Sequence, residues 1–475
     1  MPNRINRTDS SLPRRQTRRE LLRSALVGFS SLTLPGLLQQ RAVANAAGSA
    51  KKDTAVILVW LRGGASHLET WDPKPNAPIE YRGPYDAIST ATAGIQIGEL
   101  LPKLSQCSDR YTLLRSVAHS AGGHPAGSLQ VLGGDPAVAD KPAPTYPDWM
   151  SVVNYIRRKA GRAIPNYVAV NPVDRYDSFQ IAGPSYLGAG YGPFRVTGDP
   201  NAPNFQVPNI TLDAGERDKL QRRVDLRGKM DAFRNQLDSS GLMEAVDQYE
   251  ALALNLLTSD RAREAFDLGR ESEKTRDRYG RNQWGQQCLM ARRLVEAGVD
   301  IVTTEFDGPL CARVSNWDDH AVNHHVFDAL RHRAPYFDQA VSALIEDVYE
   351  RGLDKRVLVV VTGEFGRTPR ISYAASSGGG VASAPKGTTQ PGRDHWPRAN
   401  SMLFAGGGIR TGQVIGATDR LGEDPVEGQV GPADFLATLY HHLGIDYNSL
   451  AFTTFAGRSI PVPLRGEPIR ELCRV

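Results

Sequence analysis

The sequence has few cysteines and lacks the short motifs of several common protein classes. Its four cysteines show no CxxC spacing, which excludes a zinc ribbon. No Walker lysine follows the first glycine loop, and that loop is not G-x-G-x-x-G, so nucleotide binding has no support. The G-x-S-x-G element of α/β-hydrolases is also missing. Four cysteines allow three disulfide pairings that the sequence does not distinguish, and buried free thiols are the alternative.

The sequence also lacks a long apolar run and a basic body. After residue 46, no stretch reaches the ~20 apolar residues that a membrane-spanning helix needs. The net charge of +4 comes from residues 1–46, which hold eight arginines and two acids, whereas the remainder has 48 basic against 50 acidic residues. A nucleic-acid-binding body needs a basic face, so we expect no nucleic-acid partner. The hydrophobic share of 40% and charged share of 23% are typical of a soluble globular protein.

The first 46 residues have the order of an export signal. A twin arginine at positions 18–19 precedes a weakly apolar stretch at 24–38, and an Ala-Val-Ala sequence at 42–44 supplies a small-residue cleavage site. A basic tail followed by an amphipathic helix is the alternative. We expect residues 1–46 to be removed after export by the twin-arginine machinery, which places the protein in the periplasm or outside the cell.

Apolar strand patterns alternate with helical patterns along the rest of the chain. Strands are expected at 54–61, 111–117, 167–170, 300–305, 356–361 and 401–405, and helices at 99–107, 147–160, 283–297, 327–351 and 432–443. This alternation predicts an α/β fold with a mostly parallel sheet that is covered on both faces.

We expect residues 47–475 to form a single domain with insertions. Residues 171–208 are rich in glycine, proline and aromatics, which predicts a loop over the site. Residues 213–275 are polar and charged throughout, which predicts a helical insertion on the surface. Residues 374–390 are low in complexity and are expected to form a mobile loop.

Polar side chains follow the buried strand pattern that begins at residue 356. Glu364 and Arg367 come directly after it, and Asp394 and His395 arrive from the low-complexity segment. The carboxyl ends of strands in an open α/β sheet are where ligands collect, so this group predicts an anion or metal site. Arg367 suits bidentate binding of an anion, and a salt bridge to Glu364 is the alternative.

A second group of acids and imidazoles follows another predicted strand. It contains Asp318, His320 and His324. Aspartate and histidine are ligands suited to Zn, Mn, Fe or, with enough oxygen, Ca. Together with Asp394 and His395 they predict a divalent metal site. The alternative is a capped helix start with surface imidazoles.

The remaining candidates carry weaker signals. The glycine pair at 63–64 can bring N–H groups toward an anion. Ser120 and Ser128 are candidate hydroxyl nucleophiles beside His119 and His124. The other polar residues near the same edge are His67 and Glu69, whereas Asp72 is expected in a structural turn and His441-His442 in packing or on the surface.

Five motifs resemble one exported bacterial family, domain of unknown function 1501. They are WLRGGASHLETWDPKP, LLRSVAHSAGGHPAGSLQVLGG, NWDDH, VVVTGEFGRTP and GRDHWP. The resemblance runs from about residue 55 to residue 463. That family looks like a divergent branch of the alkaline phosphatase and sulfatase superfamily. The resemblance therefore implies a three-layer sandwich with a mostly parallel central sheet and a helical surface insertion.

The resemblance also implies where the nucleophile of the superfamily belongs. The segment ending at residues 132–134 is similar to the sulfatase segment in which Cys-x-Pro-Ser-Arg precedes Leu-Thr-Gly. Counting back from that point, the nucleophile position falls on His124, and Ser128 stands where the arginine is expected. The usual cysteine or serine is missing.

The metal positions implied by the superfamily match in part. Arg62 stands at the edge where the superfamily has an aspartate, and Glu364-Phe365 replaces an Asp-His or Asp-Asn pair. The other half of the set remains, as Asp318, His395 and either His320 or His324.

These observations predict a metal-dependent hydrolase of phosphate or sulfate esters. Its divalent cation would be Zn, Mn or Ca, and its substrate an anionic ester or a sulfated glycan. The roles we assign are metal binding by Asp318, His320 and His395, binding of anionic oxygens by Arg367 and Arg62, a further ligand or general base in Glu364, and a nucleophile or acid in His124 or His119. The alternative is a non-catalytic secreted module that binds sulfated polysaccharide or a partner enzyme.

Overall fold

The structure, a computed structural model, describes residues 53–158, 162, 164–207, 259–307, 316–380, 382–453, 459–461 and 465–473. The signal segment expected at 1–46, most of the helical insertion expected at 213–275, and Cys311 lie outside these residues. Within them, no helix combines the length and the apolar character that crossing a membrane requires.

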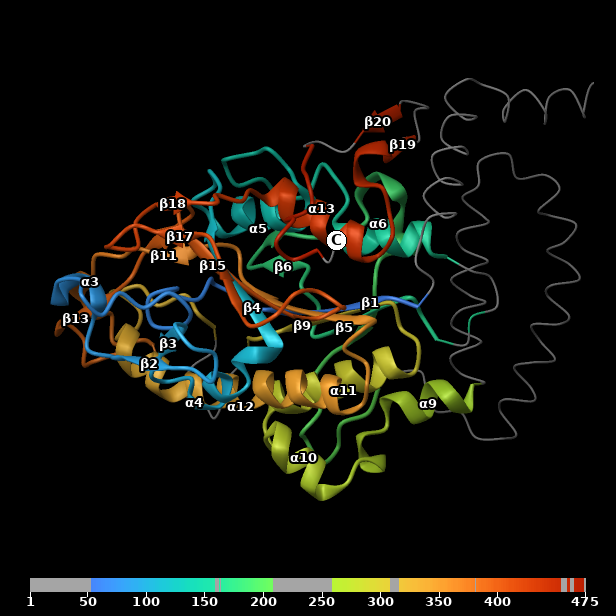
Figure 1. The fold of residues 1–475 in the computed structure, drawn as a ribbon, viewed down its shortest axis with the longest axis horizontal. Coiled ribbons are helices and arrows are strands. Elements are labelled where there is room, and N and C mark those ends of the chain that lie inside the picture. The colour runs from blue at the N-terminus through green and yellow to red at the C-terminus, as the bar shows by residue number, and fades with distance from the viewer. Residues whose placement is uncertain are drawn as a thin grey trace, which may run out of the picture.

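An eight-stranded sheet forms the centre of the fold (Figure 1). In spatial order its strands are β16 (Gln413–Ile415), β4 (Tyr111–Val117), β15 (Asn400–Gly406), β10 (Val357–Thr362), β1 (Ala55–Trp60), β9 (Ile301–Glu305), β5 (Tyr167–Val170) and β8 (Phe194–Val196). All run in one direction except β15, which is antiparallel to both β10 and β4. The sheet is therefore mixed but mostly parallel, as predicted.

Strand β1 shows why a continuous apolar run was needed here. Its six residues are all apolar and at most 2% exposed. Ile57 and Val59 pack in the apolar cluster on one face of the sheet, and Val56 and Leu58 pack in the cluster on the other face. Because side chains alternate across a strand, only a strand that is apolar at every position can be buried on both sides.

Helices cover both faces of the sheet (Figure 1). One face carries α4 (Pro102–Gln106), α9 (Asp260–Phe266), α10 (Glu273–Tyr279), α11 (Gln283–Glu296) and α12 (Val326–Glu350), and the other carries α5 (His124–Gly133), α6 (Trp149–Ile156) and α13 (Pro432–His442). The predicted three-layer α/β arrangement is confirmed. Cys107 and Cys288 are buried thiols without a disulfide, and burial raises the pKa of Cys107 to about 12.

Several elements were not predicted from the sequence, and α5 and β8 show why. Helix α5 occupies the small-residue segment after His119 to which no element was assigned, because its glycines and alanines carry little periodic signal. The segment expected to be loop at 171–208 contains β8, a three-residue edge strand that pairs with β5. A strand that short, between glycines and prolines, shows too little alternation to be recognised.

The low-complexity segment joins the two strands of a hairpin. Strand β12 (Ser372–Ala375) pairs antiparallel with β13 (Thr389–Gly392), and residues 376–388 connect them. The hairpin packs on the chain next to His320, since Gln390 donates a hydrogen bond to the carbonyl of Ala321 at 2.7 Å. The segment thus delivers Asp394 and His395 to the edge of the sheet.

Helix α6 offers a test of the local structure. Asp148 is its N-cap, is 3% exposed, and accepts hydrogen bonds from Ser151 N at 2.7 Å and Ser151 Oγ at 3.0 Å. We expect Asp148→Ala to lower the free energy of unfolding by about 1–2 kcal/mol, because the cap acceptor is lost. Chemical denaturation monitored by circular dichroism measures the change.

The matched control is Asp148→Asn, which keeps an acceptor at the cap. Burial raises the pKa of Asp148 to about 6, so the negative charge adds little that an amide would lose. We expect this variant to stay close to the wild type. Equal losses in both variants would contradict the cap as the source of the effect.

Candidate metal centre

The glycine loop after β1 makes room for Asp318. Gly63 has a φ of +98°, and a Cβ on it would lie 2.6 Å from the backbone nitrogen of Asp318. Trp317 N also donates a hydrogen bond to Arg62 O at 2.8 Å. Only glycine combines this backbone angle with so close an approach. The loop therefore holds Asp318 against the carboxyl end of β1.

The loop amides bind an anion from within the protein. Gly63 N donates a hydrogen bond to Glu364 Oε1 at 2.9 Å, and Gly64 N donates to the carbonyl of Leu61 at 3.0 Å. Both N–H groups, which the sequence analysis proposed for binding an external anion, therefore already donate hydrogen bonds within the protein, one of them to the carboxylate of Glu364.

A pair of two-residue strands connects the segment after β10 with the segment that carries His395. Strand β11 (Gly366–Arg367) pairs antiparallel with β14 (His395–Trp396), with Arg367 opposite His395. The backbone that leaves β10 therefore carries His395 beside it. His119 N adds a hydrogen bond to Pro397 O at 2.9 Å, which ties the loop after β4 to the same place.

His124 is the first residue of α5. The helix can begin there because Gly123 is its N-cap and Asp140 Oδ1 accepts a hydrogen bond from Ala126 N at 3.0 Å. Pro125 suits the first turn, where its missing N–H costs nothing. His124 is thereby held at the carboxyl edge of the sheet, facing the loops after β1 and β10.

Four side chains from distant parts of the sequence meet at this edge. One ligand atom from each of His124, Asp318, His320 and His395 lies within 4.8 Å of all the others. The Nε2 atoms of His320, His124 and His395 are 2.9, 3.1 and 3.4 Å from Asp318 Oδ1. Three of the four were predicted as metal ligands from the sequence, whereas His124 was predicted as a nucleophile or acid.

Each imidazole of this cluster has an acceptor for its other nitrogen. The Nδ1 atom of His124 lies 2.6 Å from Glu364 Oε1, and that of His320 lies 2.7 Å from Asp394 Oδ1. His395 Nδ1 lies 2.7 Å from the carbonyl oxygen of Gly122. Acceptors of this kind fix the proton on Nδ1 and leave the Nε2 lone pair free to bind a metal.

The convergence of these lone pairs calls for a positive charge between them. His320 Nε2 and His395 Nε2 are 3.0 Å apart, and His124 Nε2 is buried without a hydrogen-bond partner. Neutral imidazoles with their protons on Nδ1 would present three lone pairs to each other and to a carboxylate, which is unfavourable. A cation placed between them attracts each lone pair and the carboxylate, so the residues fit a bound metal ion.

Arg367 secures the carboxylate of the cluster. Its side chain is 1% exposed, and its Nη2 donates to Asp318 Oδ1 at 2.7 Å and to the carbonyl of Gly63. Its Nε donates to Gly64 O at 3.0 Å and its Nη1 to Arg393 O at 3.2 Å. Arg367 therefore positions Asp318 and the glycine loop, and the sequence prediction that it holds a substrate anion does not match these contacts.

Electrostatics keep Asp318 ionised. Burial alone would raise its pKa, but the three imidazoles around Oδ1 and the charge of Arg367 hold the pKa well below its usual range. Burial lowers the pKa of His395. Burial opposes the charged form of His124 too, yet the carboxylates of Asp318 and Glu364 beside its two nitrogens outweigh burial and raise the pKa of His124.

One side of the cluster is open to solvent. The side chains of Asp318, His320 and His395 are 20%, 25% and 23% exposed, whereas that of His124 is 9% exposed. Structural metal sites are closed, and catalytic sites keep a position free for water or substrate. The partial exposure therefore favours a site that a small molecule can reach.

Two residues predicted as metal ligands lie outside the cluster. His324 is nearly buried with its Nδ1 3.5 Å from Asp319 Oδ1, and Asp319 pairs with Arg333 at 2.6 Å. Asp394 contacts His320 from behind and is 53% exposed. The loop and turn at residues 318–324 direct Asp318 and His320 to the cluster and bring His324 against Asp319 instead, which spacing in the sequence did not resolve.

Other predicted site residues have structural partners. His119 Nε2 donates to the backbone carbonyl of Glu364 at 2.6 Å, because its Nδ1 accepts from Ala121 N at 3.3 Å. Burial lowers the pKa of His119. Arg62 lies 3.5 Å from Asp307 and 3.7 Å from Glu305, and burial raises the pKa of Glu305.

The weaker candidates are likewise engaged elsewhere. His67 Nε2 contacts Gly422 O at 2.9 Å, and Glu69 forms a fully buried ion pair with Arg393 at 2.5 Å. Ser120 Oγ accepts a hydrogen bond from Gln130 at 3.0 Å. Ser128 is fully buried one helical turn after His124.

Sequence reasoning missed Tyr176. It belongs to β6 (Arg175–Tyr176), is 7% exposed, and its ring stacks on His124 with centroids 4.0 Å apart. The loop at 171–208 was predicted to lie over the site, but it contains several aromatic residues and nothing in the sequence distinguishes this one.

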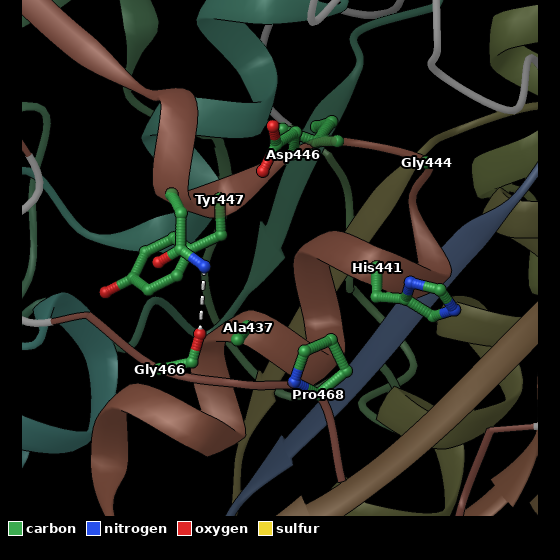
Figure 2. Close-up of a pocket in the computed structure, with 9 residues that line it drawn as sticks. Ala437, His441, Gly444, Asp446, Tyr447, Gly466 and Pro468 are labelled. Carbon is green, nitrogen blue, oxygen red and sulfur yellow. Dashed lines mark hydrogen bonds between the residues drawn. The ribbon is translucent and has the colours of Figure 1, made fainter. Parts of the chain in front are cut away.

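A surface hollow of about 370 Å³ lies elsewhere, around the end of α13 (Figure 2). Its ionisable residues are His441, Asp446 and Tyr447, and Asn448 donates a hydrogen bond to Gly466 O at 3.2 Å. The neighbouring His442 contacts Ala55 O, at the start of β1. The cluster of His124, Asp318, His320 and His395 lies beyond the other end of β1, roughly 17 Å away along the strand.

Comparison with known proteins gives a family and distant structural likenesses. Residues 53–473 match the family described as "Protein of unknown function (DUF1501)". No curated protein matches the sequence.

Among solved structures, the chain is similar to Ps i-CgsB, with 10% identity, 83% of this chain and 72% of that chain covered, and a TM-score of 0.36. It is similar to the PsFucS1 sulfatase from Pseudoalteromonas sp., with 11% identity, coverages of 86% and 72%, and a TM-score of 0.34. It is also similar to the C-terminal periplasmic domain of EcEptC from Escherichia coli in complex with Zn, with 10% identity, 84% of each chain and a TM-score of 0.33.

Metal analysis of single variants tests the cluster. We expect the wild type to bind a divalent cation and His124→Ala to weaken that binding by about 100-fold or more, since losing a residue that only supports a ligand already costs 10–100-fold. The change is measured by titration of metal-stripped protein followed by calorimetry.

The matched controls are two histidines that follow His320 in the sequence and lie outside the cluster. His324→Gln removes the ligand that spacing alone would allow, and His325→Asn keeps an N-cap for α12. Both should bind the cation like the wild type. A loss in His324→Gln as large as that in His124→Ala would contradict the cluster seen in the structure.

Proposed function

The chain belongs to the DUF1501 family, and from that premise we propose that it is an exported, metal-dependent hydrolase of phosphate or sulfate esters. The observation that supports this most is the meeting of three Nε2 atoms and Asp318 Oδ1 at a partly open edge of the sheet. The resemblance of its motifs to those of sulfatases supports the class of ester.

The ligand set favours some cations over others. Three imidazole nitrogens and one carboxylate suit Zn²⁺, Mn²⁺ or Fe²⁺. Calcium takes about six to eight oxygen ligands, so Ca²⁺, which the sequence left open, fits the cluster poorly. His124, Asp318, His320 and His395 would hold the ion. When bound, it would supply Lewis-acid polarisation of an ester oxygen and a lowered pKa for water.

Attraction of an anionic substrate depends on that cation. Near the cluster, Asp318, Glu364 and Asp394 are carboxylates, and Arg367 is the guanidinium that contacts them. Without a metal ion this group carries more negative than positive charge and repels a phosphate or sulfate. With a divalent ion the excess is removed, so ester binding and metal binding should be coupled.

The chain's own residues orient the site and exclude water from one side. Glu364 is fully buried, so it cannot reach an incoming water and instead keeps the proton of His124 on Nδ1. Phe365 covers the back of the site, with its ring centroid 4.6 Å from that of His395 and 5.1 Å from that of His124. Asp394 is half exposed and holds the proton of His320 on Nδ1, so it supports that ligand from behind.

One observation favours the alternative, a non-catalytic secreted module that binds sulfated polysaccharide. Among the hydrogen bonds of the described residues, none joins a serine, threonine or cysteine side chain to His124, Asp318, His320 or His395, and the motif resemblance puts His124 at the nucleophile position of the superfamily. Attack by water keeps the hydrolase proposal consistent with this, since the open side faces solvent.

Activity assays separate the two proposals. We expect the metal-loaded wild type to hydrolyse an aryl phosphate or an aryl sulfate, and His395→Ala to lower kcat/KM by about 100-fold or more, because a ligand is lost. Chelation should abolish the activity and re-addition of metal should restore it. His325→Asn is the control.

Absence of turnover in metal-loaded protein would contradict the hydrolase. In that case, metal-dependent binding of a sulfated polysaccharide, measured by calorimetry, would support the binding module instead.

Export by the twin-arginine route is the second part of the proposal. We expect an Arg18→Lys and Arg19→Lys double variant to remain in the cytoplasm as the full-length precursor, since the signal is read by its arginine pair. The matched control changes the neighbouring pair, Arg14→Lys and Arg15→Lys. Cell fractionation and immunoblotting measure both, and processing of the first variant to mature size would contradict the route.

A further inference from the structure

Tyr176 is the residue of the loop at 171–208 that reaches the metal cluster. Strand β6 pairs antiparallel with β7 (Phe179–Gln180), and this hairpin places Tyr176 over the first turn of α5. Its side chain is 7% exposed. Burying a tyrosine beside charged groups requires partners for both its ring and its hydroxyl, and the structure supplies them.

The hydroxyl of Tyr176 contacts the second carboxylate oxygen of Asp318. The hydroxyl oxygen lies 3.4 Å from Asp318 Oδ2, whereas Oδ1 of the same carboxylate faces the three imidazoles. The phenol is the donor in this contact, and the carboxylate oxygen accepts. The two oxygens of Asp318 are thus held in different directions.

The ring of Tyr176 fixes the plane of His124. The two rings are nearly parallel, with an interplanar angle of 9° and centroids 4.0 Å apart. The hydrogen bond from His124 Nδ1 to Glu364 and the covalent bond to Cβ restrain the imidazole along one edge. Stacking on Tyr176 further restricts tilting of the ring, so the direction of the Nε2 lone pair depends in part on Tyr176.

Arg62 supports the ring from behind. Its guanidinium carbon lies 4.4 Å from the centroid of Tyr176. Because His124 already occupies one face at 4.0 Å, Arg62 takes the opposite face. Arg62 is itself held by Glu305 and Asp307 and donates to Arg175 O at 2.9 Å. The tyrosine is therefore clamped between a fixed cation and a metal-binding imidazole.

We propose that Tyr176 is a positioning residue of the metal centre, which sets the direction of both His124 and Asp318 and thereby the affinity and geometry of the bound cation. This rests on the proposed function, since it presupposes that the cluster binds a metal ion. It assigns to the hairpin over the site a role in the centre itself, and it gives Arg62 a role through Tyr176 in place of direct contact with an anionic substrate.

Cobalt provides the test, because its visible absorption reports the geometry of its ligands. Metal-stripped full chain is titrated with Co²⁺ as the wild type and as the variants Tyr176→Phe, Tyr176→Leu and Tyr186→Phe. Tyr176→Phe removes only the hydroxyl, whereas Tyr176→Leu removes the stacking surface as well. Tyr186→Phe is the matched control, a tyrosine of the same segment that packs on Phe452 away from the cluster.

We expect Tyr176→Phe to bind Co²⁺ about 10-fold more weakly and Tyr176→Leu about 100-fold more weakly, the range found when partners of metal ligands are removed. Both spectra should differ from that of the wild type, and the control should match it. Thermal unfolding of the metal-free proteins accompanies the titration. A changed spectrum in Tyr176→Phe with an unchanged unfolding midpoint supports positioning, since a merely space-filling role would leave the spectrum alone.

Two results would overturn the inference, and they are distinguishable. Equal Co²⁺ affinity and identical spectra in the wild type and both Tyr176 variants would remove the role of Tyr176 while leaving the metal centre in place. Failure of the wild type to bind Co²⁺ would remove the metal centre and the proposed function together.

Discussion

The candidate centre depends on one carboxylate oxygen, Oδ1 of Asp318, being held ionised where three imidazoles meet. Burial would by itself favour the protonated acid, and the surrounding donors reverse that preference. Arg367 supplies the permanent charge, and the glycine loop after β1 allows the backbone of Asp318 to come close enough. Without these two features, no ionised carboxylate oxygen would lie between the three imidazoles.

The same principle extends outward through buried charges. Arg393 is fully buried next to the segment that carries His395, and it pairs with Glu69 and donates to the carbonyls of Thr368, Pro369 and Tyr81. A buried ion pair adds little net stability, but removing one partner leaves an uncompensated charge. We interpret Arg393, like Arg367 and Glu364, as a residue that fixes the backbone and side chains around the centre.

The sequence predicted much of the fold because its strong signals are local. The runs that became β1 and β10 are buried throughout, β4 is buried except at Arg115, and α12 has helical periodicity; all four lie where expected. Helix α5 and strand β8 were not predicted, because the small residues of α5 and the short length of β8 give little hydrophobic periodicity. The antiparallel direction of β15 also escaped, since a strand reads the same in either direction.

The candidate site was predicted in part for a related reason. Placement after strand ends gave Asp318, His320 and His395, because the carboxyl ends of parallel strands share an edge. His324 and Asp394 share that placement but point elsewhere or contact a ligand from behind. The position of a residue in the chain does not give the direction of its side chain.

The sequence by itself determined the layered fold, the edge at which the site lies and the kinds of ligand present, because apolar periodicity and residue chemistry are local properties. Only the tertiary structure shows that His124 lies among the predicted ligands, that Arg367 and Glu364 contact the cluster, and that Tyr176 stacks on His124. These arrangements are set by distances between side chains far apart in sequence, such as the 3.1 Å between His124 and Asp318. Such distances follow from how the loops pack on one another, and no local pattern encodes that packing.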